Sequence, residues 1–287
     1  MEEYYFLFAA ALVYALVAAI YDLRTREVPN WLNFSLIAVA LSYRLFFSLY
    51  YGWYQFILYG LLGFLVFYLL ANLFYYAKVF AGGDAKLLMG IGCILPFESF
   101  GDFFFIGIGF IFILFAVGSV YSLAYSIFLA GKNYSAFKPR FIKKFRENGK
   151  LFIFSLIFII LLLGETIYFS SSYVFFLCTS LFLLIVPGLY IYLKAVESSC
   201  MIKLVSSKDA TEGDWLEKDV RVGNRVIRKS VHGLSKEEIK ILRKYGKKIW
   251  IKYGIPFVPA FFLALAAMVF FFLFAQADIQ SFFYYLF

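Results

Sequence analysis

The amino-acid sequence predicts an all-α polytopic membrane protein with about eight membrane-embedded helices and a small α+β cytoplasmic insert. Of its 287 residues 63% are hydrophobic, and the mean hydropathy of +0.83 is far above that of ordinary soluble domains. A second observation is a series of apolar runs, most of them about 20 residues long, which is the length that crosses a bilayer. A third is the aromatic content of 23%, with tyrosines near the ends of the runs, as an interfacial belt requires.

The apolar runs define the expected membrane segments. They are 4–21, 31–50, 54–77, 84–97, 102–130, 151–169, 173–194 and 256–277. The fourth run is short and ends near Pro96, so we expect a half-buried or broken span, which is tolerated where protein or a watery cavity satisfies its backbone. The fifth run is longer than a perpendicular span needs, so it should tilt or project into the cytoplasm.

Basic residues predict the orientation. Segment 131–150 contains seven Lys and Arg residues and segment 195–254 contains fourteen, so both are expected in the cytoplasm. The basic-poor loops 50–54 and 97–101 then fall outside, and both termini are extracytoplasmic in a multi-pass protein of the cell membrane. The net charge of +9 is concentrated beside the membrane. It therefore indicates contact with anionic lipid at the cytoplasmic face, and not with nucleic acid.

The segment 201–254 is the sizeable polar stretch and forms the expected insert. Ser235 and Glu238 match a capping box at the start of a helix, which we expect to continue to Gly254. An apolar stripe of Ile239, Leu242 and Ile249 supports that helix. The weak alternation across 220–227, with a possible turn at 222–225, predicts a hairpin.

These segments give three expected domains. Residues 1–200 form a membrane core, residues 201–254 form the cytoplasmic insert, and residues 255–287 form the final span and a tail.

Asp22 ends the first apolar run. A carboxylate at membrane depth is costly unless it is paired or hydrated, so it marks a functional site by default. The alternative is a structural role for Asp22 as a helix end or a cap beside Arg24, at the water interface. The following Val28-Pro29-Asn30 predicts a rigid turn, because proline fixes φ and Asn30 can cap the next helix. This turn should return the chain past Asp22.

Asp84 opens the short fourth run, after Ala81-Gly82-Gly83. Gly82 and Gly83 allow a close approach of another chain or a positive φ, so an extended substrate could lie there with its scissile carbonyl beside the carboxylate. The alternative is a structural role for Asp84 as the N-cap of its own helix.

The predicted orientation places Asp22 and Asp84 at the same cytoplasmic face. Two carboxyl groups at one depth suggest aspartyl-protease chemistry, in which the pair shares one proton. This chemistry needs neither a metal nor a cofactor. A proton-coupled transporter remains the competing class, since intramembrane carboxylates also relay protons.

The pattern Asp22-x-Arg24-x4-Pro29-Asn30, followed by Gly83-Asp84-x-Lys86-Leu87, resembles the type IV prepilin peptidases, which are GxGD membrane aspartyl proteases. The absence of paired CxxC motifs after the first run is similar to the archaeal prepilin and preflagellin peptidases. Ala81 replaces the first glycine of the motif, and a positive φ at that position would count against activity. The resemblance covers about residues 4–130, and residues 200–262 resemble a carboxy-terminal extension of archaeal members.

The resemblance implies that Asp22 and Asp84 are catalytic and that Gly82 and Gly83 contact substrate, with Glu27 and Lys86 as further substrate-binding candidates. For Glu27, a solvated surface residue is the alternative. The implied partners are precursor proteins with a short basic leader and an apolar helix, which are cut at the cytoplasmic face. A presenilin-like intramembrane protease is the alternative suggested by Tyr21-Asp22.

The remaining candidates are weaker. Arg44 lies in the outer half of the second run and is expected to extend its side chain outward to the interface. His232, the single histidine, is expected at the surface of the insert. The three cysteines are widely spaced and form no CxxC, so neither a zinc site nor a dithiol redox site is indicated.

Overall fold

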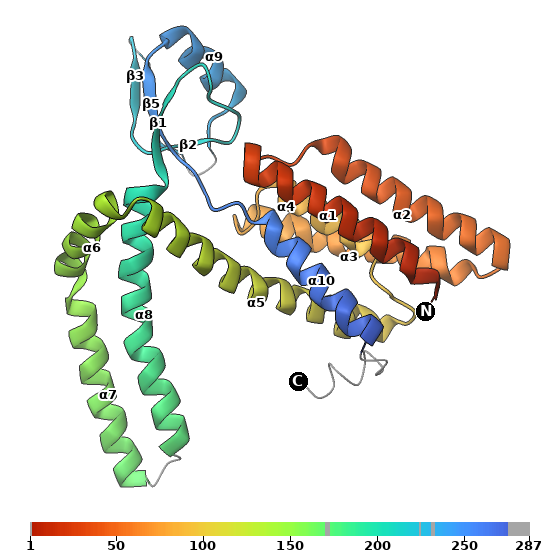
Figure 1. Ribbon diagram of the computed structural model, residues 1–287, viewed down its shortest axis with the longest axis horizontal. Coiled ribbons are helices and arrows are strands. Elements are labelled where there is room, and N and C mark those ends of the chain that lie inside the picture. The colour runs from red at the N-terminus through yellow and green to blue at the C-terminus, as the bar shows by residue number, and fades with distance from the viewer. Residues whose placement is uncertain (1, 170–172, 224, 231–232, 275–287) are drawn as a thin grey trace. The chain divides into compact units, whose positions relative to one another are not determined.

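The structure is a computed structural model, and it describes residues 2–169, 173–223, 225–230 and 233–274 (Figure 1). His232, Asn224 of the predicted hairpin turn and the last residues of the final apolar run lie outside the described residues.

The chain divides into two compact units. Unit 1 comprises Met1–Leu123 and Pro256–Phe287, and unit 2 comprises Ala124–Ile255. Contacts therefore group the sixth and seventh apolar runs with the polar insert. The division into three domains stays a prediction, with boundaries expected at 1–200, 201–254 and 255–287.

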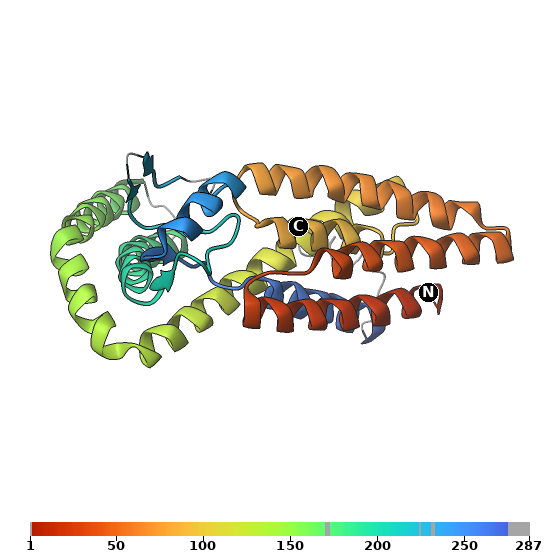
Figure 2. The same ribbon diagram turned by 90° about the horizontal axis from the view of Figure 1, so that it is seen from above.

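Unit 1 contains six apolar helices. They are α1 (Tyr5–Thr25), which follows the short turn η1 (Glu2–Tyr4), α2 (Asn30–Tyr51), α3 (Tyr54–Tyr76), α4 (Gly82–Gly92), most of α5 (Phe100–Lys132) and α10 (Val258–Phe274). Helix α10 packs along α1, and α4 packs against both α2 and α3 (Figure 1). Figure 2 shows the same unit from above.

All eight predicted apolar runs form helices, and the chain is a polytopic all-α membrane protein. Among the described residues, five helices are long and apolar enough to cross a membrane, namely α1, α2, α3, α5 and α8. Helices α6 and α7 add a sixth span if the bent pair is counted as one. The 11 residues of α4 extend only about 16 Å at 1.5 Å per residue, so this helix is too short to cross, as the short fourth run predicted.

Glycines let α3 and α4 approach closely. A Cβ atom on Gly63 would lie 2.2 Å from the carbonyl oxygen of Gly92, and one on Gly92 would lie 2.6 Å from that of Gly63. Small residues at such positions allow van der Waals packing between backbones, which drives helix association in membranes. The short helix that carries Asp84 is therefore fixed against a full-length span.

Arg44 is fully buried, so the expectation that it extends to the interface is wrong. Its guanidinium lies 4.5 Å from the ring centre of Phe56 and donates to carbonyl oxygens beyond the end of α4. Its strongest bonds run to the carbonyl oxygens of Cys93 at 2.7 Å, Leu95 at 2.8 Å and Phe56 at 2.8 Å. Cys93 and Leu95 lie beyond the last residue of the short helix, where carbonyl oxygens have no helical donor, and in a bilayer such groups must be satisfied from within the protein.

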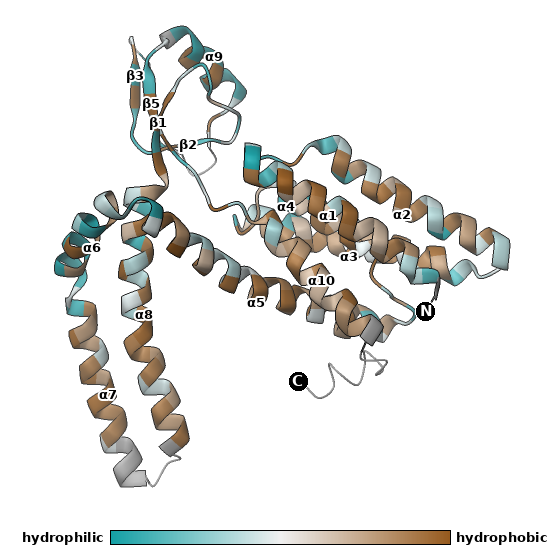
Figure 3. Ribbon diagram, in the orientation of Figure 1, coloured by the Kyte–Doolittle hydropathy of each residue, from teal (hydrophilic) through white to brown (hydrophobic). Residues whose placement is uncertain are grey.

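Unit 2 contains three further helices that follow the end of α5. They are α6 (Tyr134–Asn148), α7 (Lys150–Phe169) and α8 (Tyr173–Cys200). Helices α7 and α8 form an apolar hairpin, whereas α6 is amphipathic and rich in basic residues (Figure 3). Helix α6 lies in segment 131–150, which is expected in the cytoplasm because of its charge. The axes of α6 and α7 differ in direction by 52°.

The insert follows α8 directly and has its own hydrophobic core. Its strands are β1 (Ile202–Ser206), β2 (Trp215–Leu216), β3 (Val220–Val222), β4 (Arg225–Ile227) and β5 (Lys248–Lys252), with α9 (Lys236–Tyr245) before β5. One antiparallel sheet has the order β1-β5-β2, and β3 pairs with β4. The predicted hairpin and the α+β class are confirmed.

The predicted capping box is also confirmed, but the predicted end of its helix is wrong. Ser235 Oγ accepts from the N–H of Glu238, and Glu238 Oε2 accepts from the N–H of Ser235 at 2.9 Å. The helix ends before Gly246, which has φ +70°, and not at Gly254. Ile249 lies in β5, where buried and exposed residues alternate with the period of two that is typical of a strand.

Candidate active site

Asp22 lies in the last turn of α1, and its side chain is only 7% exposed. Asp22 therefore does not lie at the water interface, as the alternative interpretation expected. Its Oδ2 accepts a hydrogen bond of 3.0 Å from the backbone N–H of Val258, the first residue of α10. The N–H of Phe257 also interacts with this carboxylate. Asp22 thus caps a helix that lies 236 residues further along the chain.

The first turn of a helix needs such an acceptor. Its leading N–H groups have no intrahelical partner, and together they carry about half a positive charge, which favours a nearby carboxylate. Val258 is itself buried, so no bulk water reaches its N–H easily. This contact could not be predicted from the sequence, because no pattern near Asp22 indicates that α10 packs against it.

Asp84 is the third residue of α4 and is 8% exposed. Its Oδ2 accepts a hydrogen bond of 3.1 Å from the N–H of Ala81, which is the N-cap residue. The expected structural alternative was Asp84 as the N-cap, whereas the carboxylate reaches back to the cap from inside the helix. Ala81 has φ −74° and ψ 167°, an extended conformation that alanine adopts without strain. Alanine in place of the first motif glycine therefore places no strain on the backbone.

Two contacts hold the start of α4 against the turn between α1 and α2. Lys86 Nζ donates to Asn30 Oδ1 at 2.6 Å, and Asn33 Nδ2 donates to the carbonyl oxygen of Gly83 at 3.4 Å. These contacts bring Asp84 to the end of the bundle that carries Asp22. Asp22 and Asp84 therefore lie at the same end of unit 1.

The expected turn at 28–30 joins α1 to α2, but the residue that caps α2 differs from the prediction. Pro29 is the N-cap of α2, and Asn30 is the first helical residue, whose side chain binds Lys86 instead of capping. Arg26 ends α1 in the left-handed conformation with φ +60°. Lys86 therefore has a structural partner within the site, while Glu27 is exposed.

Gly82 and Gly83 form the first turn of α4, and neither has a positive φ. A Cβ atom on Gly83 would lie 3.2 Å from the Cβ of Val28, which is tighter than ordinary contact. A Cβ on Gly82 would meet only a ring atom of Tyr75, at 3.9 Å. Close packing against the turn after α1 therefore explains a glycine at position 83, and nothing in the structure requires one at position 82.

This difference gives a testable prediction. Gly82→Ala should raise stability by up to about 1 kcal/mol, because alanine favours a helix more than glycine does. Gly83→Ala should lose that gain, since its methyl group presses on Val28. Thermal unfolding of the two purified variants measures the difference. Equal melting temperatures would contradict the close approach, and a loss of cleavage by the stable Gly82→Ala variant would indicate substrate contact at that residue.

A third buried carboxylate belongs to Asp102. Its Oδ2 accepts from the N–H groups of Glu98 at 2.8 Å and Ser99 at 2.7 Å, at the start of α5. It lies beyond the end of α4 where Arg44 binds, away from Asp22 and Asp84. Asp22, Asp84 and Asp102 are each buried and each bind a backbone N–H group near the start of a helix. Asp22 and Asp84 differ from Asp102 in lying at the same end of unit 1.

Comparison with known families found one match. Residues 8–129 match the family model of the type IV leader peptidase family. The matched residues make up less than half of the chain. Among curated proteins and among solved structures, none matches the chain.

The matched segment runs from α1 to the last turn of α5. It contains both aspartates and the contacts that join α4 to the α1–α2 turn. It does not contain α10, although Val258 binds Asp22. The insert and helices α6 to α9 also lie outside the match.

Proposed function

We propose that this protein is a membrane aspartyl endopeptidase that removes the leader from archaeal type IV pilin-like or archaellin precursors at the cytoplasmic face of the membrane. The observation that carries the proposal is the placement of two buried aspartates at one end of the leader-peptidase segment. Within the described residues, no group of three or more His, Cys, Asp and Glu side chains could hold a metal ion.

In the proposed reaction one aspartate is ionised and the other is protonated. The ionised carboxylate takes a proton from water as the oxygen attacks the scissile carbonyl carbon. The protonated carboxyl hydrogen-bonds the carbonyl oxygen and stabilises the charge that develops there. Collapse of the tetrahedral intermediate breaks the C–N bond, and a proton passes to the leaving amine. The two groups titrate as a unit, so the proton belongs to the pair.

The proposed substrates carry a short basic leader before an apolar helix. The helix would lie in the bilayer, and the scissile bond at its cytoplasmic end. Glu27 is exposed five residues after Asp22, where it can pair with a basic residue of the leader. Gly82 remains a candidate for substrate contact because a side chain there would meet little. The absence of CxxC pairs supports the archaeal assignment.

A cleavage assay tests the proposal. The purified full chain in liposomes should cut a membrane-inserted precursor once, between its basic leader and its apolar helix. Cleavage inside the apolar helix would instead favour a presenilin-like protease. Proton flux without cleavage would favour a transporter, and an inactive protein would contradict the proposed peptidase.

The proposed orientation places 131–150 and the insert in the cytoplasm and both termini outside. On a cysteine-free background, Asn133→Cys and Lys208→Cys should react with an impermeant thiol reagent from the cytoplasmic side. Gln55→Cys, which is exposed at the start of α3, should react from the opposite side. Labelling of all three from one side would overturn the orientation.

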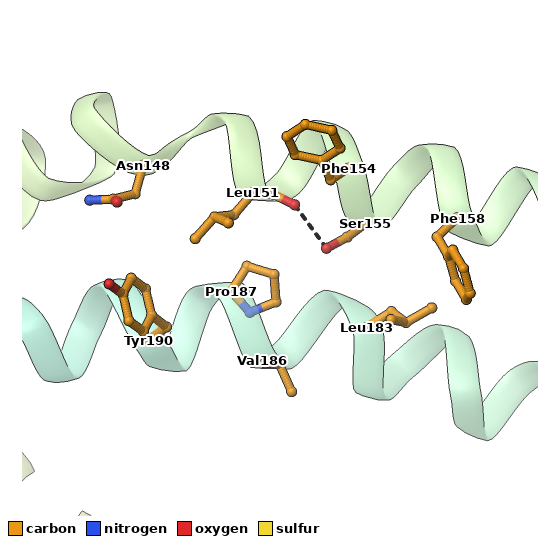
Figure 4. Close-up of a pocket in the computed structure, with 9 residues that line it drawn as sticks. All are labelled: Asn148, Leu151, Phe154, Ser155, Phe158, Leu183, Val186, Pro187 and Tyr190. Carbon is orange, nitrogen blue, oxygen red and sulfur yellow. Dashed lines mark hydrogen bonds between the residues drawn. The ribbon is translucent and has the colours of Figure 1, made fainter.

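Anionic lipid is a further proposed partner, at the junction of α6 and α7. A cavity of about 570 Å³ lies between α7 and α8. Figure 4 shows Asn148 and Tyr190 at one end of it and Phe158 and Leu183 at the other. The remaining lining residues are Leu151, Phe154, Ser155, Val186 and Pro187. A polar end beside basic residues and an apolar body suit a lipid with a charged headgroup.

Native mass spectrometry of the purified protein tests the lipid contact. The protein should retain anionic phospholipid over zwitterionic phospholipid, and Arg146→Gln with Lys150→Gln should reduce that preference. Lys240→Gln with Arg243→Gln, an equal change of charge on α9, is the control. Equal effects of the two pairs would indicate a general charge effect and no site at the junction.

A further inference from the structure

We infer that the first turn of α10 belongs to the active site and holds the Asp22 carboxylate in its catalytic position. The inference rests on the proposed proteolytic function. It adds a positioning element from outside the segment that matches the leader peptidase family.

The contact itself is specific. The Val258 N–H donates to Asp22 Oδ2 at 3.0 Å, and both residues are buried. Hydrogen bonds to a charged acceptor are stronger than neutral ones, and few rotations of the Asp22 side chain preserve this one. Loss of the donor would leave a buried carboxylate with one fewer partner and freer to turn away from Asp84.

The turn is anchored from two sides. A Cβ atom on Gly118 of α5 would lie 2.5 Å from Phe257 Cζ. The ring of Phe257 can therefore take this position only because residue 118 is a glycine. The same ring lies 5.8 Å from that of Phe80, centre to centre. Phe80 precedes Ala81, whose N–H binds Asp84. One aromatic contact therefore joins the backbone segments that hold the two aspartates.

The chain connects this turn to the insert. Strand β5 ends at Lys252 and α10 begins at Val258, so residues 253–257 lead from the insert into the cap of Asp22. The leader-peptidase segment 8–129 thus depends on the carboxy-terminal part of the chain for a complete site.

Val258→Pro tests the inference directly. Proline lacks the N–H but suits the first position of a helix, where its fixed φ is favourable. The kcat for precursor cleavage should fall about 10- to 100-fold, the loss expected for a hydrogen bond to a charged group, with little change in KM. Tyr54→Pro, which makes the same change at the exposed first residue of α3, should retain most of the activity.

A second comparison needs no change in α10. Asn is a good helix cap and can accept the Val258 N–H, whereas Ala cannot. Asp22→Ala should therefore melt roughly 2–8 °C below Asp22→Asn, while neither cleaves. Equal melting temperatures together with wild-type kcat in Val258→Pro would overturn the inference and leave the proposed function standing. A wild-type protein that fails to cleave would instead remove the proposed function.

Discussion

Asp22→Asn and Asp84→Asn are each expected to lower the rate of precursor cleavage at least ~100-fold, because an amide cannot exchange the proton that general acid–base catalysis requires. Each asparagine can still accept the backbone N–H that the carboxylate binds, from Val258 or from Ala81. The variants should therefore insert, fold and melt close to the wild-type protein. Single-turnover cleavage in liposomes, together with thermal unfolding, measures both effects.

Asp102→Asn is the matched control. Asp102 is also buried and also binds backbone N–H groups at the start of a helix, but it lies away from the other two. If burial and helix capping alone explained the loss, all three variants would lose activity alike. Near wild-type cleavage by Asp22→Asn or Asp84→Asn would end the proposal of an aspartate pair.

Much of the fold follows from local patterns in the sequence. Apolar runs located all eight apolar helices, because the cost of exposing backbone groups to lipid makes a long apolar run helical. The same reasoning identified the fourth run as too short to span. The strand β5 was missed because the capping box before it correctly predicted a helix, and Ile249 was assigned to the apolar stripe of that helix.

The site was predictable only in part. Asp22 and Asp84 stand out as carboxylates at the ends of apolar runs, and the structure brings them to one end of unit 1. The contact with Val258 was beyond sequence reasoning, since it joins residues 236 positions apart and uses a backbone N–H that any residue type but proline supplies. The start of the final apolar run at residue 256 indicated where α10 begins, but not what caps it.

Arg44 was misinterpreted for a related reason. A cation in an apolar run is expected to extend to the nearest interface. The partners of Arg44 are instead carbonyl oxygens that become available because α4 is short. The short fourth run was visible in the sequence, so its unsatisfied carbonyl groups were a signal that a buried donor had to exist.

Arg44→Met is expected to lower the free energy of unfolding by at least about 3 kcal/mol, because each buried carbonyl that loses its donor costs about 1–3 kcal/mol. Methionine preserves much of the volume of the side chain and removes its donors. Arg24→Ala, an exposed arginine in α1, should change stability by no more than about 0.5 kcal/mol. Unfolding in detergent measures both, and a similar small loss for both variants would show that the carbonyl groups do not depend on Arg44.

Gly60 provides an independent check on the position of Arg44. A Cβ on Gly60 would lie 2.3 Å from Arg44 Cδ, so Gly60→Ala should destabilise the protein by about 1–3 kcal/mol through overpacking. In an Arg44→Ala background the atoms that clash are absent, and the same substitution should cost much less. Two residues in contact show such non-additive effects, whereas distant residues do not. Additive losses in the double variant would mean that the arginine does not pack beside Gly60, and the role assigned to Arg44 in holding the end of α4 would fail with it.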